Sequence, residues 1–371
     1  MQADSRLRIL WLTKAWEHHV PRSGYWPMGS ALTRNPKVRV LMLDQEIVRR
    51  ATEPLPLIGR IIKALIKFDW RDARYLLSAP GKLRQARDFQ PDVVHVSAFE
   101  EGPWAIQNAR KYFPGAKISA SFHQPVFHWE ASGVSPDLVD ISVFLAQRQR
   151  DAAHPALLTK PNLVVPHGID IQFFTPENNP RSNHDVVFLG IWLRDFTVLE
   201  AAMREVLDAK AEARFQLFIP SAPHAETFLR VFAPYGDRVR VALNAPAEEL
   251  LRTLRSSRLM ILPLTDNTAN NAMLEGMACG LPLVATDVGG VREYVSAECA
   301  ILTPVGDAHS MAQAVLQLLN DDALCRRMRS AARKTAERFS WDRVAASFVE
   351  GFLNFRNGQS ARLPENDKVR S

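Results

Sequence analysis

The sequence predicts an α/β protein built from two Rossmann-like, doubly wound domains with largely parallel sheets. Its length of 371 residues exceeds what one hydrophobic core usually supports. Short apolar runs alternate with helical patterns from one end to the other, which is typical of stacked βα units. A polar stretch rich in Pro and Asn, "PENNPRSNHD" at 176–185, lies between two of these runs and indicates the interdomain linker.

Strands are expected where short runs rich in Val, Ile, Leu and Phe stand between turn residues, the pattern of buried parallel strands. In the first half these runs are 8–13, 38–43, 92–97, 117–122, 140–145 and 162–166. In the second half they are 185–190, 215–220, 238–243, 259–264, 282–287 and 300–304. We therefore expect an N-terminal domain over 1–176, a C-terminal domain over 177–338, a closing helix over 339–356 and a polar tail over 357–371.

The cysteine spacing, the apolar runs and the net charge of the sequence exclude several classes of protein. The three cysteines, Cys279, Cys299 and Cys325, lack the close spacing of a zinc or redox motif, so a reducing cytoplasm is the simplest setting. We find no signal peptide and no run near the roughly 18 to 20 apolar residues of a spanning helix. The net charge of +6 would suit an anionic partner. No zinc-finger spacing, RNA-recognition signature or Lys/Arg block favours nucleic acid.

The site is expected at the carboxyl ends of the two sheets, because ligands of doubly wound domains bind there. With two such domains in tandem, these ends should face each other across an interdomain cleft. The fold class thus predicts where the functional site lies, but it does not indicate which reaction or ligand the site serves.

A polar loop runs into a short helix in "DNTANNAMLEGMACGLPLVATDVGG", residues 266–290. Asn270 or Asn271 is a good N-cap. The amides of Thr268, Ala269, Asn270 and Asn271, with the positive end of the helix dipole, form a site suited to phosphate. Glu275, one turn inside, would accept hydrogen bonds from the hydroxyls of a ribose. The alternative is that Asn270 only caps the helix and Glu275 complements its dipole.

Three segments resemble retaining GT-B glycosyltransferases of the family 4 type, the group 1 glycosyl transferases. "NNAMLEGMACGLPLVATDVGGVREYV" is similar to the nucleotide-sugar site of that family. "LVVPHGIDIQFFTP", 163–176, resembles the segment where its chain leaves the N-terminal domain, and "FSWDRVAASFVEGFLNF", 339–355, resembles its closing helix. The resemblance implies a donor-binding C-terminal domain, an acceptor-binding N-terminal domain, a closing helix that crosses back, and neither metal nor cofactor. The donor would be a UDP- or GDP-linked sugar, and the acceptor a sugar, a lipid-linked sugar or a polysaccharide.

Some of the donor-binding residues of that family are present in this chain, and others are replaced. Two family glutamates eight positions apart contact the donor, and Glu275 matches the one that binds the ribose. Asn267 stands where the other touches the transferred sugar; it can exchange hydrogen bonds but carries no charge. Where the family has an Arg and a Lys on the diphosphate, this chain has Ile191 and Phe196. Arg194 is then the expected phosphate ligand, and the alternative is a solvated arginine paired with Asp195.

Histidines and glycines complete the candidate site. His123 matches the family's histidine near the reacting sugar; its alternative is a strand-end histidine bonded to backbone. His95 and His128 are weaker candidates of the same kind. Gly24 resembles the glycine of the loop that approaches the donor diphosphate. Gly289-Gly290 also match, although a tight turn explains them equally well.

A basic amphipathic pattern covers 56–77, with Arg60, Lys63 and Lys67 opposite an Ile-rich face. Such a helix can lie on an anionic bilayer, as in several relatives of the family, and would place the protein at the inner face of the membrane. The alternative is an ordinary helix that covers the N-terminal sheet.

We therefore expect a glycosyltransferase that retains the anomeric configuration, working in cell-envelope glycan, polysaccharide or glycolipid synthesis. No second carboxylate is evident as a covalent nucleophile, so the leaving phosphate oxygen would deprotonate the acceptor. A nonenzymatic sugar-nucleotide-binding protein is the alternative, because Asn267, Ile191 and Phe196 are where a degraded site would show. A dinucleotide-dependent oxidoreductase would need "G-x-G-x-x-G" after the first strand, which is missing.

Overall fold

The computed structural model describes residues 4–13, 25–44, 81–82, 84–101, 103–131, 135–177 and 185–358. These residues form two compact units, divided after Pro166 and again after Trp341. The first unit therefore contains the N-terminal part of the chain and the segment that follows Trp341.

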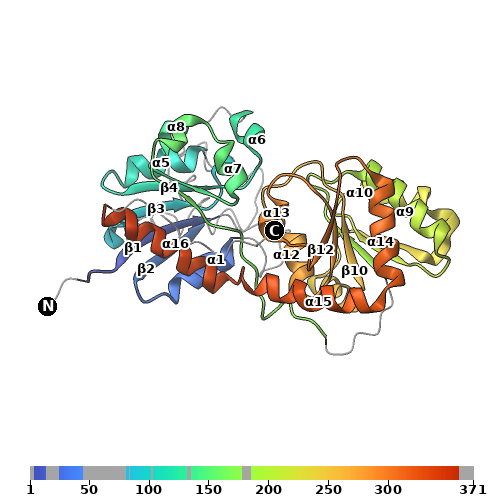
Figure 1. Ribbon diagram of the computed structural model, residues 1–371. Helices are drawn as coiled ribbons and strands as arrows, with labels where there is room; N and C mark the ends of the chain where they lie inside the picture. Colours follow the sequence, from blue (N-terminus) through green and yellow to red (C-terminus); the bar gives the residue numbers. More distant parts are fainter. Residues whose placement is uncertain are drawn as a thin grey trace. The chain divides into compact units, whose positions relative to one another are not determined.

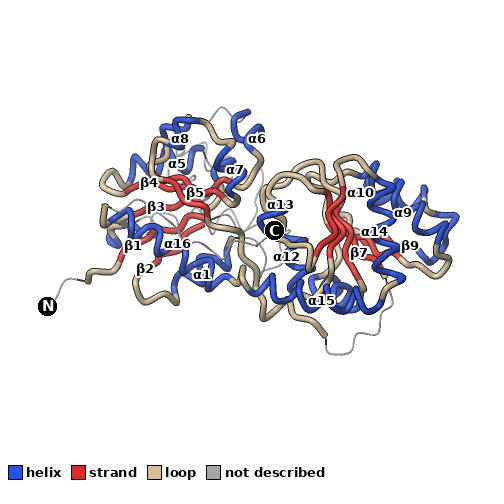
Figure 2. Tube along the Cα trace, in the orientation of Figure 1, coloured by secondary structure: helices blue, strands red, loops and turns tan. Residues whose placement is uncertain are grey.

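The first unit holds a parallel sheet of six strands in the order β2-β1-β3-β4-β5-β6 (Figures 1 and 2). Its strands are β1 (Leu7–Thr13), β2 (Val38–Asp44), β3 (Val93–Val96), β4 (Lys117–Phe122), β5 (Ile141–Phe144) and β6 (Asn162–Val164). Its helices are α1 (Trp26–Thr33), α5 (Pro103–Tyr112), α6 (Val126–Ala131), α7 (Gln147–Asp151), α8 (Pro155–Leu158) and α16 (Trp341–Arg356), with the 3-10 turns η1 (Phe99–Glu101) and η2 (Pro136–Leu138). Strand order reverses between β1 and β3.

The two faces of this sheet bury different side chains, because strand residues alternate. Leu10 and Leu12 of β1 belong to an apolar cluster together with Ile106 and Ala109 of α5. On the other face Trp11 meets Phe348 of α16 edge to face, at 5.7 Å between ring centroids. Figure 1 shows α16 alongside this sheet. The aromatic helix at the end of the sequence is therefore a covering layer of the first unit.

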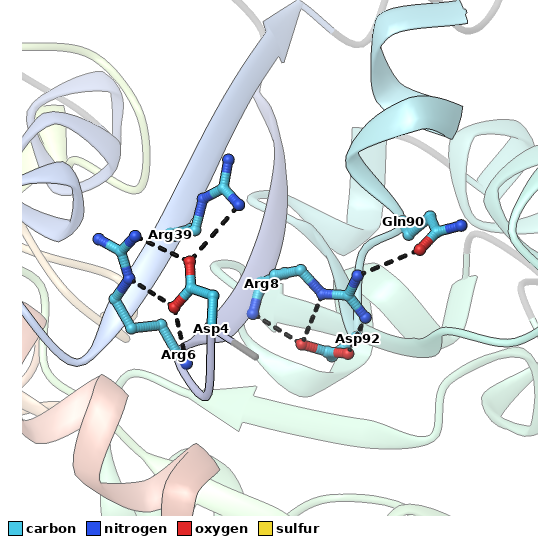
Figure 3. A network of polar contacts seen from close by, with 6 residues as sticks. All are labelled: Asp4, Arg6, Arg8, Arg39, Gln90 and Asp92. Carbon is cyan, nitrogen blue, oxygen red and sulfur yellow. Dashed lines mark hydrogen bonds and ion pairs between the residues drawn. The ribbon is translucent and has the colours of Figure 1, made fainter. Parts of the chain in front are cut away.

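A polar network lies at the start of β1 (Figure 3). Arg8 donates from Nη2 to Oδ1 of Asp92 at 2.7 Å, and its backbone N–H donates to Oδ2 of the same carboxylate at 2.8 Å. Asp4 accepts from Arg6 and lies 3.5 Å from Arg39. Arg8 lowers the pKa of Asp92 against the effect of burial. These contacts join β1, β2 and the segment before β3 at the amino ends of the strands, away from the ligand-binding edge.

The second unit repeats the architecture with a parallel sheet in the order β12-β11-β10-β7-β8-β9. Its strands are β7 (Val186–Leu189), β8 (Phe215–Phe218), β9 (Val239–Ala242), β10 (Leu259–Leu262), β11 (Leu283–Thr286) and β12 (Ala300–Thr303). Its helices are α9 (Phe196–Ala209), α10 (Ala222–Val231), α11 (Ala247–Ser256), α12 (Asn271–Ala278), α13 (Val291–Tyr294), α14 (Ala308–Asn320) and α15 (Asp322–Glu337), with η3 (Ala233–Arg238). Strand order reverses between β7 and β10.

Helices cover both faces of the second sheet. Met260 and Leu262 of β10 pack in a cluster with residues of α11, α12 and α15. Leu259 and Ile261 of the same strand pack on the opposite side with residues of α9, α10 and α14. Apolar residues in succession therefore face two different cores, which explains why the strands read as continuous apolar runs. The doubly wound α/β fold expected from the sequence is confirmed, and each expected strand run contains a strand.

The division between the units lies at Pro166/His167, upstream of the expected boundary at 176/177. The segment after Pro166 packs in the second unit, because Ile169 and Phe174 are buried in its core. Arg333 of α15 fastens the same segment by donating to the carbonyls of Phe174 and Ile171, at 2.9 and 3.1 Å. The chain therefore enters the second unit before the polar stretch at 176–185, because Ile169 and Phe174 are buried in the core of that unit.

Several expectations lie outside the described residues: Gly24, the basic pattern over 56–77, and most of the linker at 176–185 and of the tail at 357–371. Among the residues that are described, no helix has the length and apolar character needed to cross a membrane.

Candidate functional site

The reversal of strand order between β7 and β10 marks the candidate site of the second unit. Side chains and loops that follow these two strands lie together at the carboxyl edge of the sheet, where ligands of such folds bind. The loops are 190–195 after β7 and 263–270 after β10. They are joined by backbone hydrogen bonds from Asp195 N–H to the Pro263 carbonyl and from Thr265 N–H to the Leu193 carbonyl, both at 3.0 Å. The two loops therefore form one rigid rim.

The second loop leads into α12, whose amino end points to this rim. Asn270, one of the two asparagines expected as caps, takes the N-cap position and accepts from the Met273 N–H at 3.1 Å. Thr268 and Asn270 are buried, whereas Ala269 and Asn271 are partly exposed. The amides of a first helical turn have no partner within the helix, so this end is suited to bind an anion.

Glu275 lies one turn inside α12 and only 6% of it is exposed. A carboxylate is rarely buried to this degree without a polar or charged reason. Gly276, next to it, lies close to the sheet, since a Cβ there would lie 2.7 Å from the terminal methyl of Met260. The close approach of α12 to the sheet thus fixes where the carboxylate of Glu275 lies.

Arg194 is held at the rim by three hydrogen bonds. Its Nε donates to the carbonyl of Leu189 and its Nη1 to the carbonyl of Trp192, both at 2.9 Å. Its Nη2 donates to Oδ1 of Asn270 at 3.3 Å. The suggested pairing with Asp195 is absent from its bonds, because Asp195 instead caps α9 by accepting from the Val198 N–H at 3.0 Å. Arg194 is therefore a positioned cation, not a solvated loop residue.

The charge of this arginine is only partly compensated. Burial lowers the pKa of Arg194 to about 10, while the negative charge of Glu275 opposes that shift. At neutral pH the guanidinium remains protonated beside the positive end of the α12 dipole. Two positive features at one edge create a local potential that favours an anionic ligand.

Asn267 lies in the loop between β10 and α12 and is held through its backbone. Its N–H donates to Oδ1 of Asp266 at 2.7 Å, and its carbonyl accepts from the Gly290 N–H at 2.8 Å. Asn267 is 5% exposed, and its Nδ2 has no hydrogen-bond partner among the described residues. A buried amide donor without an acceptor costs about 1 to 3 kcal/mol, so it is poised to donate to a ligand.

The structure shows why glycine stands at position 289, the first of the Gly289-Gly290 pair. Its φ is +55°, and a Cβ would lie 1.9 Å from the carbonyl oxygen of Asn267. Any side chain at this position would displace the loop that carries Asn267. The Gly289-Gly290 pair therefore allows its turn to pack closely against the loop that carries Asn267.

In the first unit, strand order reverses between β1 and β3, and His123 follows the neighbouring strand β4. His123 Nε2 lies 2.5 Å from the carbonyl oxygen of Ser97, which comes directly after β3. The ring also meets Tyr25 edge to face at 4.3 Å. Burial lowers the pKa of His123 to about 4, with the Ser97 carbonyl opposing the shift. The imidazole is neutral at pH 7.

The other two histidine candidates have different surroundings. His95 is fully buried under α16, its ring nitrogens 3.0 and 3.1 Å from the hydroxyls of Ser119 and Ser121. Burial, with a smaller effect of His123, lowers its pKa to about 3. His128 lies on α6 against the exposed ring of Phe127. His95 is thus a core histidine, and of the three only His123 lies at the strand-order reversal beside Ser97.

Sequence reasoning missed two residues beside His123. Glu100 of η1 accepts from the backbone N–H groups of His123 and Gln124, at 2.6 and 2.7 Å. Gln149 of α7 donates to the carbonyls of Phe122 and Gln124, at 2.8 and 2.9 Å. A glutamate in a loop and a glutamine in a short helix give no spacing signal, because their role depends on which strands are neighbours.

The contacts of the segment "PHGID", residues 166–170, explain two of its residues. A Cβ on Gly168 would lie 2.3 Å from the Trp341 ring, so only glycine fits there. The N–H of His167 donates to the Tyr294 hydroxyl at 2.9 Å. This contact joins the segment to "VREY", residues 291–294, within the second unit. In the described parts of both units, no cluster of His, Cys, Asp and Glu has a geometry that could hold a metal ion.

Comparison with known proteins agrees with this architecture. Residues 183–321 match the family described as glycosyl transferases group 1. D-inositol 3-phosphate glycosyltransferase from Corynebacterium efficiens is 30% identical over 205 residues, which are 49% of this chain and 48% of that protein. The chain thus spans about half the length of this curated relative.

Solved structures extend the likeness to nearly the whole chain. Sucrose-phosphate synthase from Thermosynechococcus elongatus aligns with a TM-score of 0.67 at 17% identity, covering 95% of this chain and 100% of that one. Anabaena HepE, in complex with UDP and glucose, aligns with a TM-score of 0.64 at 14% identity, covering 94% and 100%. The chain therefore has the GT-B fold of two Rossmann-like units, and residues 183–321 within it match the group 1 glycosyl transferases.

Proposed function

We propose that this protein transfers a sugar from a nucleoside diphosphate sugar to an acceptor hydroxyl, with retention at the anomeric carbon and without a metal. One observation carries the proposal: Arg194, Asn270 and the amino end of α12 meet at the strand-order reversal of the second unit, one turn from the buried Glu275. A nucleoside diphosphate presents an anion and a pair of ribose hydroxyls, which match these groups.

The second unit binds the donor. The diphosphate lies at the first turn of α12 with Arg194 beside it, and Glu275 accepts hydrogen bonds from the ribose. Asn267 donates from Nδ2 to the transferred sugar, which satisfies the buried amide. Gly289 keeps the Asn267 loop in place. The HepE complex contains UDP and glucose, so uridine-linked sugars are the first donors to test.

The first unit binds the acceptor near His123. In the reaction the bond between the anomeric carbon and the phosphate oxygen breaks, and a bond to the acceptor oxygen forms on the same face. The acceptor proton passes to the leaving diphosphate oxygen, so the products are a glycoside and a nucleoside diphosphate. Stabilising the charge on that diphosphate is the main catalytic task, and it falls to Arg194 and α12.

The acceptor is a sugar or lipid-linked sugar of a cell-envelope glycan, polysaccharide or glycolipid, made in the cytoplasm. Contact with the membrane through 56–77 stays a prediction. Liposome sedimentation with and without anionic lipid tests it, and Lys63→Gln with Lys67→Gln should abolish the binding if it is electrostatic.

The decisive experiment is a thermal-stability screen of the purified full chain against UDP- and GDP-linked sugars, followed by transfer assays with the stabilising donor. A specific donor should raise the melting temperature through mass action. NMR of the product should show the donor's anomeric configuration, and EDTA should leave the rate unchanged. Stabilisation without turnover over a wide acceptor panel would favour the nonenzymatic alternative. No stabilisation by any nucleotide sugar would overturn both.

A further inference from the structure

Two exposed aromatic side chains lie at the carboxyl edge of the sheet in the first unit. In the described part of this unit three large apolar side chains are exposed: Trp26 (43%), Phe127 (55%) and Leu158 (38%). Leu158 ends α8, shortly before β6 begins at Asn162, so it lies at the amino edge of this parallel sheet. The two aromatic residues lie at the opposite edge, where ligands of doubly wound sheets bind.

Trp26 begins α1 and is placed at this edge by its neighbour Tyr25. The ring of Tyr25 meets the ring of His123, directly after β4, edge to face at 4.3 Å. It also stacks on Trp11 of β1, with the ring centroids 6.2 Å apart. Leu32 on the same helix is fully buried, so α1 is anchored in the core while its first residue stays exposed.

Phe127 lies on α6, the short helix that follows β4. Trp129, two positions further along α6, is only 2% exposed and meets the rings of Phe122 and Phe99, at 5.1 and 6.4 Å between centroids. Residues two apart on a helix point to different sides. The buried ring of Trp129 therefore anchors the helix, and Phe127 is presented to solvent from a fixed backbone.

The chemistry of these two side chains fits the C–H face of a pyranose ring. An alkyl chain packs equally well on aliphatic side chains, yet in the described part of the first unit no large aliphatic side chain is exposed at this edge. A flat aromatic ring removes the C–H groups of a sugar from water. Its π face also carries partial negative charge, which attracts their weakly positive hydrogens.

We propose that Phe127 and Trp26 determine the specificity for the acceptor by packing against the C–H face of a pyranose ring. Two rings held on anchored helices lose little freedom when a ligand binds, which favours affinity. The inference rests on the proposed function and deepens it: the group bound at the carboxyl edge of the first unit is a sugar ring, not the alkyl chain of a lipid.

The test is saturation-transfer NMR on the full chain, with the methyl α-D-pyranosides of glucose, mannose and galactose as probes. Irradiation of the aromatic signals of the protein should pass saturation to the ring C–H groups of at least one glycoside. Sorbitol is the ligand control: it carries similar hydroxyl groups on an open chain without a ring face, so it should receive little saturation.

Three substitutions of Phe127 separate a flat ring from apolar character in general. Phe127→Trp keeps a flat ring, Phe127→Leu keeps an apolar side chain without one, and Phe127→Ala removes both. The dissociation constant of the glycoside should stay within about threefold in Phe127→Trp and rise about tenfold in the other two. Trp26→Phe and Trp26→Leu should differ in the same way. Leu158→Ala, the matched control at the amino edge, should change nothing.

Transfer assays add a readout that a merely structural role would not give. With the bound glycoside as acceptor, Phe127→Leu should raise the acceptor KM by about tenfold and leave kcat within about twofold, as for the loss of a contact made equally before and during the reaction. The donor KM should also stay within about twofold, because the donor contacts belong to the second unit.

Absence of saturation transfer to all three glycosides in the wild type would overturn the inference. Wild-type affinity in Phe127→Leu would also overturn it, because apolar character alone would then suffice. An equal loss in Leu158→Ala would reveal a nonspecific effect, with the same consequence. If no nucleotide sugar stabilises the chain or is turned over, the proposed function fails, while the NMR comparison still tests the two aromatic residues. If transfer proceeds and the ring variants behave as the wild type, the inference alone fails.

Discussion

Arg194 donates a hydrogen bond from Nη2 to the side-chain oxygen of Asn270, 3.3 Å away, and Asn270 in turn caps α12. The guanidinium is thereby attached to the helix end where we propose that the diphosphate binds. Gly190, with φ of +91°, allows this arrangement, because a Cβ there would lie 3.2 Å from Nη2 of Arg194. The contact links two segments that are far apart in the sequence and is the basis of the first prediction.

Arg194→Gln should weaken binding of the nucleotide sugar by about ten- to a hundredfold, since a charge-assisted contact with phosphate contributes roughly 1.5 to 3 kcal/mol. The loss should shrink as salt concentration rises, because the removed term is electrostatic. Isothermal titration with UDP at two salt concentrations measures both effects.

The matched control for Arg194 is Arg230→Gln, which removes an exposed cation from α10. It should leave the affinity within about twofold. Equal affinity of Arg194→Gln and wild type would remove Arg194 from the diphosphate site.

Glu275→Gln should reduce affinity for UDP by about tenfold or more, because a carboxylate accepts from two hydroxyls whereas an amide offers one oxygen. The effect should disappear when the ligand is a 2′,3′-dideoxy nucleotide, which lacks the hydroxyls. Titration with the two nucleotides separates ribose binding from a general loss of structure. A similar loss for both ligands would contradict the ribose role.

Asn267→Glu should change the choice of donor sugar and leave nucleotide affinity within about threefold. The new carboxylate can accept but not donate hydrogen bonds, whereas the present Nδ2 donates. Transfer rates across a panel of UDP-linked sugars, with UDP affinity measured alongside, test the separation. An unchanged preference among donor sugars would show that Asn267 does not contact the transferred sugar.

Gly289→Ala should destabilise the second unit by about 2 kcal/mol or more, because its Cβ meets the Asn267 carbonyl at positive φ. Gly306→Ala is the matched control: its φ is +76°, but nothing lies within 4 Å of the added Cβ. The control should lose only about 1 kcal/mol, the backbone cost of the left-handed conformation. Urea unfolding measures both, and equal losses would show that the contact between the loops carries no energy.

The buried His95 should make stability depend on pH. Burial lowers its pKa from 6.5 to about 3 in the folded state, so between these values the unfolded chain binds more protons. Stability should therefore be complete above about pH 6.5 and fall as the pH drops toward 4. The neighbouring His123 adds to this slope with the same sign, although it is only half-buried.

His95→Asn tests this dependence. The amide can still reach the hydroxyl of Ser119, which contacts Nδ1 of His95, but it does not titrate. The loss of unfolding free energy between pH 6.5 and 4.5 should therefore be smaller than in the wild type. Each pKa unit of difference corresponds to about 1.4 kcal/mol. The exposed His224→Asn should leave the slope unchanged. A variant as sensitive to acid as the wild type would assign the slope to other groups.

The sequence by itself determined the secondary structure and the fold class. Apolar runs in β10 and β11 predict buried parallel strands because each successive side chain must face a different core. Asn270 before an apolar helix predicts the cap, since that preference is local. Glu275 could be proposed as a ligand because its spacing from the cap places it one turn inside the helix.

Only the tertiary structure decided which loops lie together. Strand order places β7 beside β10, so Arg194 reaches Asn270, and no local pattern encodes that pairing. The hydrogen bonds of Glu100 and Gln149 with the backbone of residues 122–124 likewise depend on the order of β3 and β4 and on the position of α7. Hydrogen bonds between distant segments form only once the sheet has aligned the ends of its strands, whereas caps and strand periodicity arise from neighbours in the chain.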